Sequence, residues 1–221
     1  HLTDAAGDAI HAGMSAKDAI VTALTGATRR AKGHAAAYQH VTKARLEAVC
    51  DLNEERLGAF ADEFAIPRRY TDLREMLETE RPALLHVVTQ PTQRLEFFEL
   101  AAECGVPAVL VEKPLCLDAE DFLAIEAFGA SHDLRICVNH QLRYHPKTLE
   151  LLGIVRSGEI GEVRMLQAEL GFPIPYNSES RYYDAGMGGG ALLDLGIYPL
   201  SLAYYLLGPP EAGKMLMGNA P

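Results

Sequence analysis

The stretch that decides the fold is Ala19-Ile-Val-Thr-Ala-Leu-Thr-Gly-Ala-Thr-Arg-Arg-Ala-Lys-Gly33, in which an apolar run of strand length leads into a glycine turn. A helix-forming segment, residues 34–42, follows the turn directly. A strand, a glycine turn and a helix in this order are typical of a βαβ unit that binds phosphates at the turn. A plain structural turn between a strand and a helix has the same order, so the turn alone leaves both interpretations open.

The following hundred residues repeat this alternation of short apolar runs and longer helix-forming segments. Apolar runs occupy residues 46–50, 84–88, 108–111 and 136–138, with a weaker one near residues 69–70. Segments of helical character lie between them, at residues 54–64, 73–78, 92–104 and 119–132, and Asp72 and Asp118 are expected N-caps. Strict alternation predicts an α/β fold over residues 19–139: a doubly wound parallel sheet of the Rossmann type with helices on both faces.

The pattern changes after Asn139. Residues 147–157 indicate a helix, residues 163–171 an alternating strand, and residues 172–187 a long polar and aromatic loop. An apolar helix is expected to open at Gly188 and to run to about Leu207, with a kink at Gly196 and Pro199. Residues 140–221 are therefore predicted to form an incomplete α+β second domain, and residues 1–18 an N-terminal extension outside the fold.

Composition excludes several classes of protein. The 221 residues are 48% hydrophobic and carry a formal net charge of −10, with no apolar run near the ~20 residues that span a bilayer and no basic excess for nucleic acid. The four cysteines lack metal-like spacing, so we expect four buried free thiols and a cytoplasmic protein. Nor do the histidines and carboxylates show a metal-binding pattern, so no metal is expected, and His40 and His86 are interpreted as surface or core residues.

The loops that follow parallel strands all open on one edge of the sheet, where doubly wound proteins bind ligands. Asp51, at the end of the second strand, suits a ribose hydroxyl of NAD, or caps the next helix. Arg29 and Arg30 suit the additional phosphate of NADP, so NAD is expected with NADP as the alternative. The cofactor-binding residues predicted at this edge are Gly26, Thr28, Arg29, Arg30, Asp51, Thr89, Gln90, Pro91 and Glu112.

Three residues, Lys113, Asp194 and Tyr198, are candidates for the chemistry itself. Lys113 follows an apolar strand and is either a proton donor and acceptor in the crevice or a solvated partner of Glu112. Asp194 lies on an apolar helix, in one stripe with Tyr198 and Ser201, and a carboxylate there is either used in a site or buried in an ion pair. The polar cluster after residue 138 suits hydroxylated ligands, and Asn139, Gln141 and Arg143 are its predicted substrate-binding members.

Taken in order, these motifs resemble the Gfo/Idh/MocA oxidoreductases over about Ile20 to Leu207. The resemblance depends on His34-Ala-Ala-Ala-Tyr38, Val-Cys-Asp51, Thr89-Gln-Pro-Thr92, Glu112-Lys113-Pro114, Ser157-Gly-Glu-Ile-Gly-Glu162 and Gly188-Gly-Gly-Ala-Leu-Leu-Asp194-Leu-Gly-Ile-Tyr198. Two features depart from the family pattern: Thr28 replaces the middle glycine of the turn, and Arg94 stands where many members have histidine.

The resemblance implies NAD(P)-dependent hydride transfer at a secondary alcohol or hemiacetal carbon of a sugar or cyclitol, in a homo-oligomer. It assigns proton transfer or substrate orientation to Lys113 and substrate hydroxyls to Asp194. Most members have a catalytic histidine at the position of Tyr198, and the glucose-fructose oxidoreductase branch has a tyrosine there, as this sequence does. Two alternatives stay open: an NAD-dependent glycosidase of the same family, and a non-catalytic dinucleotide-binding protein.

Overall fold

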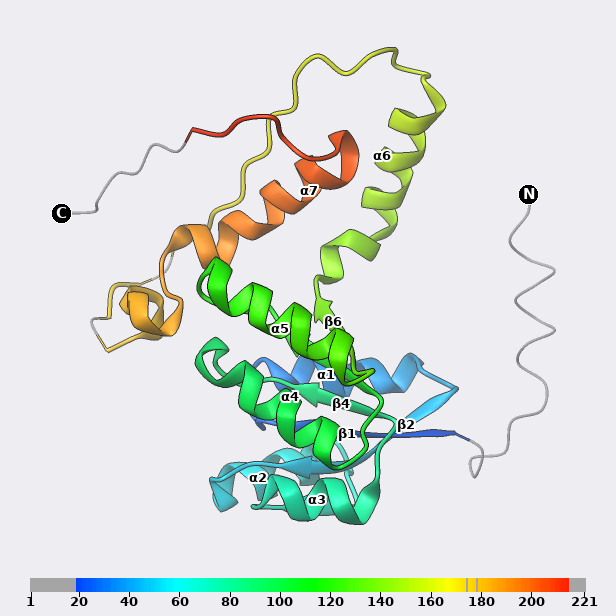
Figure 1. The fold of residues 1–221 in the computed structure, drawn as a ribbon, viewed down its shortest axis with the longest axis vertical. Helices are drawn as coiled ribbons and strands as arrows, with labels where there is room; N and C mark the ends of the chain where they lie inside the picture. The colour runs from blue at the N-terminus through cyan, green and yellow to red at the C-terminus, as the bar shows by residue number, and fades with distance from the viewer. Residues whose placement is uncertain (1–18, 174, 178, 215–221) are drawn as a thin grey trace. The chain divides into compact units, whose positions relative to one another are not determined.

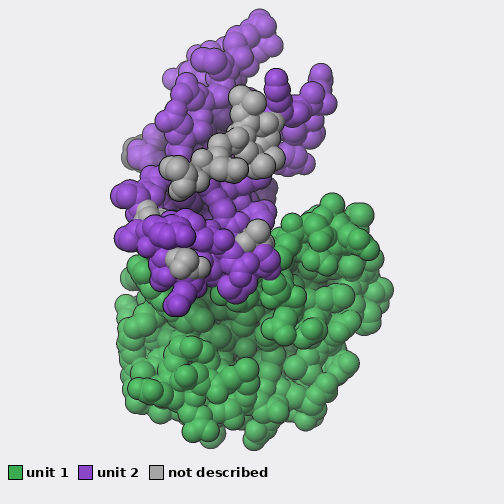
Figure 2. Space-filling model, turned by 90° about the vertical axis from the view of Figure 1, so that its left-hand side faces the viewer, with its two compact units in different colours: residues 1–139 green, residues 140–221 purple. Residues whose placement is uncertain are grey.

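A computed structural model describes residues 19–173, 175–177 and 179–214, so the predicted extension over residues 1–18 lies outside the described residues. The chain separates into two compact units, residues 1–139 and 140–221, which Figure 2 colours separately.

Unit 1 contains a six-stranded parallel sheet. Its strands are β1 (Ile20–Thr25), β2 (Ala44–Cys50), β3 (Arg68–Tyr70), β4 (Leu84–Val87), β5 (Ala108–Glu112) and β6 (Arg135–Asn139). They pair in the order β3-β2-β1-β4-β5-β6, so the direction of winding reverses between β1 and β4. This order confirms the predicted doubly wound fold and brings the ends of β1 and β4 together at the edge where such sheets bind ligands.

The helices of unit 1 lie where helix-forming segments are expected, with shifted ends. They are α1 (Ala31–Ala37), followed by the 3₁₀ turn η1 (Tyr38–His40), then α2 (Glu54–Glu63), α3 (Leu73–Glu80), η2 (Pro91–Gln93), α4 (Arg94–Glu103) and α5 (Ala119–Ser131). Asp72 and Asp118 cap α3 and α5 as predicted, because their side chains accept hydrogen bonds from Glu75 N–H and Asp121 N–H.

The helices cover the two faces of the sheet and form two separate cores (Figure 1). On one face, α3, α4 and α5 pack side chains such as Met76, Phe98 and Ile125 against the sheet. On the other face, α1 and α2 pack against Leu24 and Val49. Side chains point to alternate faces along a strand. Every second side chain of β1, counted from Leu24, therefore faces α1, and so do the side chains of β4 and β5 that lie level with them.

Unit 2 is helical and irregular in its described residues. It contains η3 (Gln141–Tyr144), α6 (Pro146–Ser157), η4 (Arg181–Tyr183), η5 (Ala185–Met187), the π-helix η6 (Leu192–Gly196) and α7 (Ile197–Leu207). The strand predicted over residues 163–171 is wrong: this segment has no regular secondary structure and belongs to no sheet. No other segment among the described residues of the unit forms a strand, and a strand needs a neighbour to satisfy its backbone.

The predicted apolar helix also starts later than expected. Gly188 does not open it, and helical structure begins at Ala191 as a π-turn that leads into α7. The irregularity expected near Gly196 and Pro199 takes the form of this π-turn, whose hydrogen bonds span one residue more than those of an α-helix.

Across the described ranges, no helix is both long and apolar enough to cross a membrane. All four cysteines are free thiols, as predicted, but the expectation that all are buried is wrong, because Cys137 on β6 is exposed and only Cys50 is fully buried.

Candidate active site

The turn after β1 has room only for glycine at its first position. Gly26 has φ of +91°, and a Cβ added there would lie 2.6 Å from the carbonyl oxygen of Val88. The turn closes on itself through hydrogen bonds from Thr28 N–H to the Gly26 carbonyl and from Ala31 N–H to the Thr28 carbonyl. The close approach therefore packs the turn against the end of β4 and carries Arg29 and Arg30 to the ligand edge.

Asp51 holds this turn in place. One carboxylate oxygen accepts Ala27 N–H at 2.7 Å and Arg56 Nε–H at 3.0 Å, while the other accepts Asn53 N–H at 2.9 Å and Arg56 Nη2–H at 2.5 Å. Burial opposes ionisation of the group, but these hydrogen bonds outweigh it and lower the pKa of Asp51. Both oxygens thus have two protein donors each, and binding to a ribose hydroxyl stays a prediction.

Arg94 joins the ends of β4 and β5. Its side chain is buried, with Nη1 donating to the Val87 carbonyl and the Thr89 hydroxyl, and Nη2 donating to the carbonyls of Thr89 and Glu112. Burial lowers the pKa of Arg94 to about 10. Of the predicted residues in the following loop, Pro91 is buried, whereas Gln90 is exposed.

Glu112 contacts two other predicted site residues, Arg30 and Asn139, and also His34. Its buried Oε1 lies 2.9 Å from Arg30 Nε, 2.6 Å from Asn139 Nδ2 and 2.8 Å from His34 Nε2. Burial disfavours its charge, but the hydrogen bonds from His34, Asn139 and Arg30 lower the pKa of Glu112 to about 2. Lys113 follows directly, joined to Pro114 by a cis peptide bond.

Behind Glu112 lies a set of buried polar residues that the sequence analysis does not identify. His34 Nδ1 lies 3.0 Å from His86 Nδ1, and His86 Nε2 lies 2.8 Å from the Tyr38 hydroxyl. His86 is a core residue, as predicted, but it is hydrogen-bonded on both sides. The sequence holds one indication of this arrangement, the position of His86 in β4. Side chains alternate between the faces of a strand, so His86 lies on the same face of the sheet as Thr22, the face that α1 covers.

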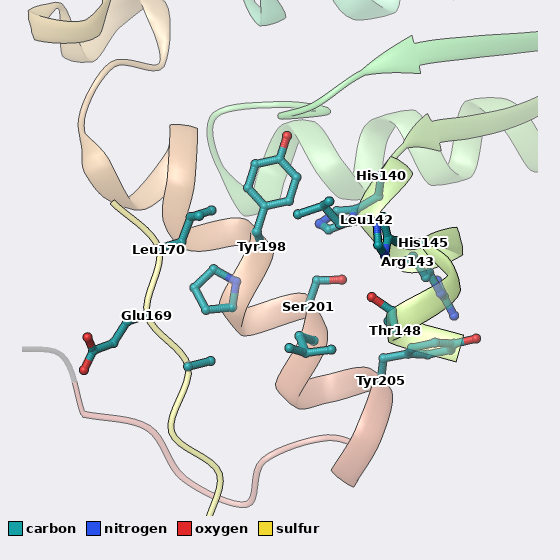
Figure 3. Close-up of a pocket in the computed structure, with 13 residues that line it drawn as sticks. His140, Leu142, Arg143, His145, Thr148, Glu169, Leu170, Tyr198, Ser201 and Tyr205 are labelled. Atoms are coloured by element: carbon teal, nitrogen blue, oxygen red, sulfur yellow. The ribbon is translucent and has the colours of Figure 1, made fainter. Parts of the chain in front are cut away.

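Unit 2 contains a pocket of about 260 Å³ between η3, α6 and α7 (Figure 3). In Figure 3 the hydroxyl groups of Ser201 and Thr148 turn toward each other inside the pocket, whereas the carboxylate of Glu169 turns away. The pocket is lined by His140, Leu142, Arg143, His145, Thr148, Ala168, Glu169, Leu170, Tyr198, Pro199, Ser201, Leu202 and Tyr205.

The predicted residues of unit 2 divide between this pocket and other places. Tyr198 and Arg143 line it, and the Arg143 guanidinium lies 4.4 Å from the ring centre of Tyr205. Gln141 is exposed and does not line it. Asp194 does not line it either; it is buried, with Arg181 Nη2 at 3.5 Å.

His140 is a pocket residue that the list of predicted site residues missed. Its ring meets that of Tyr198 edge to face with centroids 5.0 Å apart, and both of its ring nitrogens are buried. Within the described part of the chain neither nitrogen has a hydrogen-bond partner. Buried imidazole nitrogens are costly when unpaired, so they favour a polar ligand beside Tyr198.

The residues at the ligand edge of unit 1 suit a dinucleotide. The obligatory glycine turn and two guanidinium groups match anionic phosphates, and they lie where the winding of a parallel sheet reverses. Among residues 19–173, 175–177 and 179–214 no group of three or more His, Cys, Asp or Glu side chains is arranged to hold a metal ion. The fold and site define a dinucleotide-binding Rossmann domain.

Comparison with known proteins identifies the family. Residues 20–140 match the model of the oxidoreductase family with the NAD-binding Rossmann fold, and residues 148–220 match that of the GFO/IDH/MocA C-terminal domain. The chain therefore belongs to the Gfo/Idh/MocA oxidoreductases, as the resemblance predicted, and its first unit is an NAD-binding domain.

Three relatives show the range of the family. An uncharacterized oxidoreductase of Rhizobium meliloti is 35% identical and covers 71% of this chain and 46% of its own length. A D-apiose dehydrogenase of Paraburkholderia graminis is 29% identical, covering 88% and 55%. The crystal structure of the WlbA dehydrogenase from Bordetella pertussis with NADH and UDP-GlcNAcA has a TM-score of 0.74 and 26% identity, covering 86% and 60%. The chain spans about half the length of the curated relatives it matches.

Proposed function

We propose that this protein is an NAD(P)-dependent dehydrogenase that transfers a hydride between the nicotinamide and a secondary alcohol or hemiacetal carbon of a sugar or polyol. The observation that supports it best is the cluster at Glu112. Three N–H donors fix this carboxylate at the ligand edge of an NAD-binding sheet, and Lys113 follows it immediately. Relatives that act on D-xylose and D-apiose support the choice of substrate class.

The cofactor-binding residues in this proposal are the Gly26 turn with Thr28, Arg29 and Arg30, together with Asp51 and the loop of Thr89, Gln90 and Pro91. Glu112 belongs to the same set and also holds Arg30, because its Oε1 accepts from the Arg30 guanidinium. When bound, the nicotinamide accepts or donates the hydride.

Lys113 and the pocket of unit 2 provide the remaining functions. Lys113, which is half-buried directly after β5, donates or accepts the proton of the reacting hydroxyl, since a positioned lysine side chain can act as a general acid or base. Hydroxyl groups of Thr148 and Ser201 and the nitrogens of His140 provide hydrogen bonds to substrate hydroxyls, and Leu142 and Leu202 contact its apolar faces. Tyr198 and Asp194 keep their predicted places among the catalytic residues, with Asp194 binding substrate hydroxyls, and Asn139, Gln141 and Arg143 keep their predicted roles in substrate binding.

The test combines cofactor binding with turnover. Wild type should quench or shift NADH fluorescence on titration and should reduce NAD or NADP with a member of an aldose and polyol panel. Lys113→Ala should retain cofactor affinity within about threefold while turnover falls by about two orders of magnitude or more, the usual contribution of a positioned acid or base. Absence of NADH binding would refute the proposal, and binding without turnover across the panel would favour the non-catalytic alternative.

We also propose that the protein is a cytoplasmic homo-oligomer, as the family resemblance and the free thiols suggest. Light scattering at several protein concentrations measures the mass of the assembly, and a monomer at every concentration would contradict this proposal.

Release of a chromogenic aglycone without net NADH formation would identify the protein as the NAD-dependent glycosidase of the same family.

A further inference from the structure

A line of polar side chains, buried except for the half-buried Tyr38, lies between helix α1 and the sheet, and the proposed function uses only its first member, Glu112. It starts at Glu112 on β5 and ends at a backbone carbonyl of β2. Its five contacts are Glu112 Oε1 to His34 Nε2 at 2.8 Å, His34 Nδ1 to His86 Nδ1 at 3.0 Å, His86 Nε2 to Tyr38 Oη at 2.8 Å, Tyr38 Oη to Thr22 Oγ1 at 2.6 Å, and Thr22 Oγ1 to the Arg45 carbonyl at 2.9 Å.

These five contacts need five hydrogens, but the neutral side chains supply only four. The ionised carboxylate and the carbonyl at the two ends bring no hydrogen. His34, His86, Tyr38 and Thr22 each bring one when neutral. One contact between two electronegative atoms is therefore left without a hydrogen. A single additional proton completes the line. His34 then donates to Glu112 on one side and to His86 on the other, and each following side chain donates to the next as far as the Arg45 carbonyl.

Of the two imidazoles in the line, His34 is the one that contacts a carboxylate, at 2.8 Å. Glu112 Oε1 also accepts hydrogen bonds from Arg30 and Asn139, which keep it ionised, in agreement with its pKa of about 2. Burial and the nearby His34 lower the pKa of His86 to about 3, so His86 stays neutral. Asn139 Nδ2 lies 3.2 Å from His34 Nε2 because both nitrogens donate to the same carboxylate oxygen.

The charge on His34 matters at the ligand edge because Glu112 lies between two cations. With His34 charged, the group of His34, Glu112 and Arg30 has a net charge of +1, and the guanidinium of Arg30 is only partly neutralised. With His34 neutral, Glu112 pairs with Arg30 alone and the group has no net charge. Arg94 reaches only the backbone carbonyl of Glu112.

We propose that His34 takes up this proton and acts as a positioning residue for Arg30, so that a dinucleotide binds more tightly to the protonated protein. The proposal depends on the proposed cofactor site at the Arg29–Arg30 turn. It also requires His86 to change tautomer without ever becoming charged. His86 carries its hydrogen on Nε2 when His34 is protonated, and on Nδ1 when His34 is neutral and accepts from it.

The first test observes the protons directly. Imidazole ¹⁵N spectra of the full chain between pH 5.5 and 8.5 should show His34 gaining a second proton at low pH while His86 stays neutral and moves from Nδ1–H to Nε2–H. The signals are assigned with His34→Gln and His86→Asn. A His86 ring that keeps one tautomer across this range would overturn the proposal.

The second test measures NADH affinity over the same pH range by fluorescence titration. Removing one charge near the phosphates should raise the wild-type Kd about fivefold from pH 5.5 to 8.5. Tyr38→Phe removes two contacts and one hydrogen, so three contacts have three hydrogens and no extra proton is needed. This variant should show a flat Kd, as should His34→Gln, whereas His40→Gln, on the exposed surface, should keep the wild-type slope.

Three outcomes separate the explanations. A Tyr38→Phe variant with the wild-type slope would refute the proton count. A wild-type Kd that does not change with pH, with NADH still bound, would refute the role of His34 and leave the cofactor site standing. No NADH binding at any pH would refute the cofactor site and, with it, the role given to Arg30.

Discussion

Replacement of Asp51 separates ribose binding from support of the Gly26 turn; the helix-capping role expected for Asp51 is wrong, because Asn53 is the N-cap of α2. In Asp51→Ala the buried Ala27 N–H loses its only acceptor at 2.7 Å, and an unpaired buried donor costs about 1–3 kcal/mol. The ion pair with Arg56 adds less than about 1 kcal/mol, because half of the Arg56 side chain is exposed and solvent screens the charge. Asn53 N–H also loses its acceptor at 2.9 Å, so the total loss of stability is about 3 kcal/mol.

This loss corresponds to a fall in Tm of about 6–12 °C for a chain of this size. Arg56→Ala, the matched control, removes only the exposed partner and should lower Tm by about 1–3 °C. Far-UV circular dichroism is the suitable probe for heat and urea unfolding, because the chain has no tryptophan.

The dependence on pH has a definite sign. The pKa of Asp51 is lowered in the folded protein, so its stabilising contribution is fully present above its unfolded pKa, about 3.9, and is lost as the pH falls through the folded value. The difference between wild type and Asp51→Ala should be constant from pH 6 to 8 and shrink below about pH 4. If Asp51→Ala weakened NADH binding with an unchanged Tm, the residue would bind ribose and the structural reasoning would be wrong.

Three further predictions concern the turn, the thiols and the buried cation. Gly26→Ala should destabilise unit 1 by about 3 kcal/mol, because the position has a positive φ and a Cβ would overlap the Val88 carbonyl. Gly33→Ala lies in an open helical position and should stabilise the unit by about 0.5–1 kcal/mol, so equal urea midpoints for the two variants would contradict this prediction. Iodoacetamide at pH 8 should modify exposed Cys137 before Cys50, whose pKa burial raises to about 12, and peptide mass spectrometry would reveal the opposite order. Arg94→Lys keeps the charge but loses the fork of bonds to three carbonyls, so the urea midpoint should fall by the equivalent of about 2 kcal/mol; an unchanged midpoint would show that these bonds contribute little.

Local patterns in the sequence were sufficient to predict unit 1. Most of the strands contain an apolar run, and α2, α3 and α5 begin at the side-chain caps Asn53, Asp72 and Asp118, so the βαβ alternation can be identified one segment at a time. The parallel order of the strands then follows from general rules of chain connection. Only the helix ends, where packing against the sheet competes with propensity, were displaced by a few residues.

The contacts of Glu112 could not be predicted in this way. His34 and Asn139 are far from Glu112 in the sequence, and a histidine followed by alanines looks the same whether or not it reaches a carboxylate. The alternation of residues 163–171 misled for a related reason. A period of two shows that a segment can form a strand, but only a neighbouring strand with open hydrogen-bonding groups makes it one.

The π-turn at Leu192–Gly196 sets the angle around the helix axis between the side chains that precede it and those that follow it. In a regular helix Asp194 and Tyr198 would lie only about 40° apart around the axis, because each residue advances about 100°. The wider turn changes that rotation, so the directions of the two side chains depend on the number of residues in the turn; Tyr198 lines the pocket and Asp194 does not. Deleting one residue between them would restore a regular helix and turn the preceding segment by about a quarter of a revolution. Chain length at this one turn therefore controls the direction of the Asp194 carboxylate independently of its chemical identity.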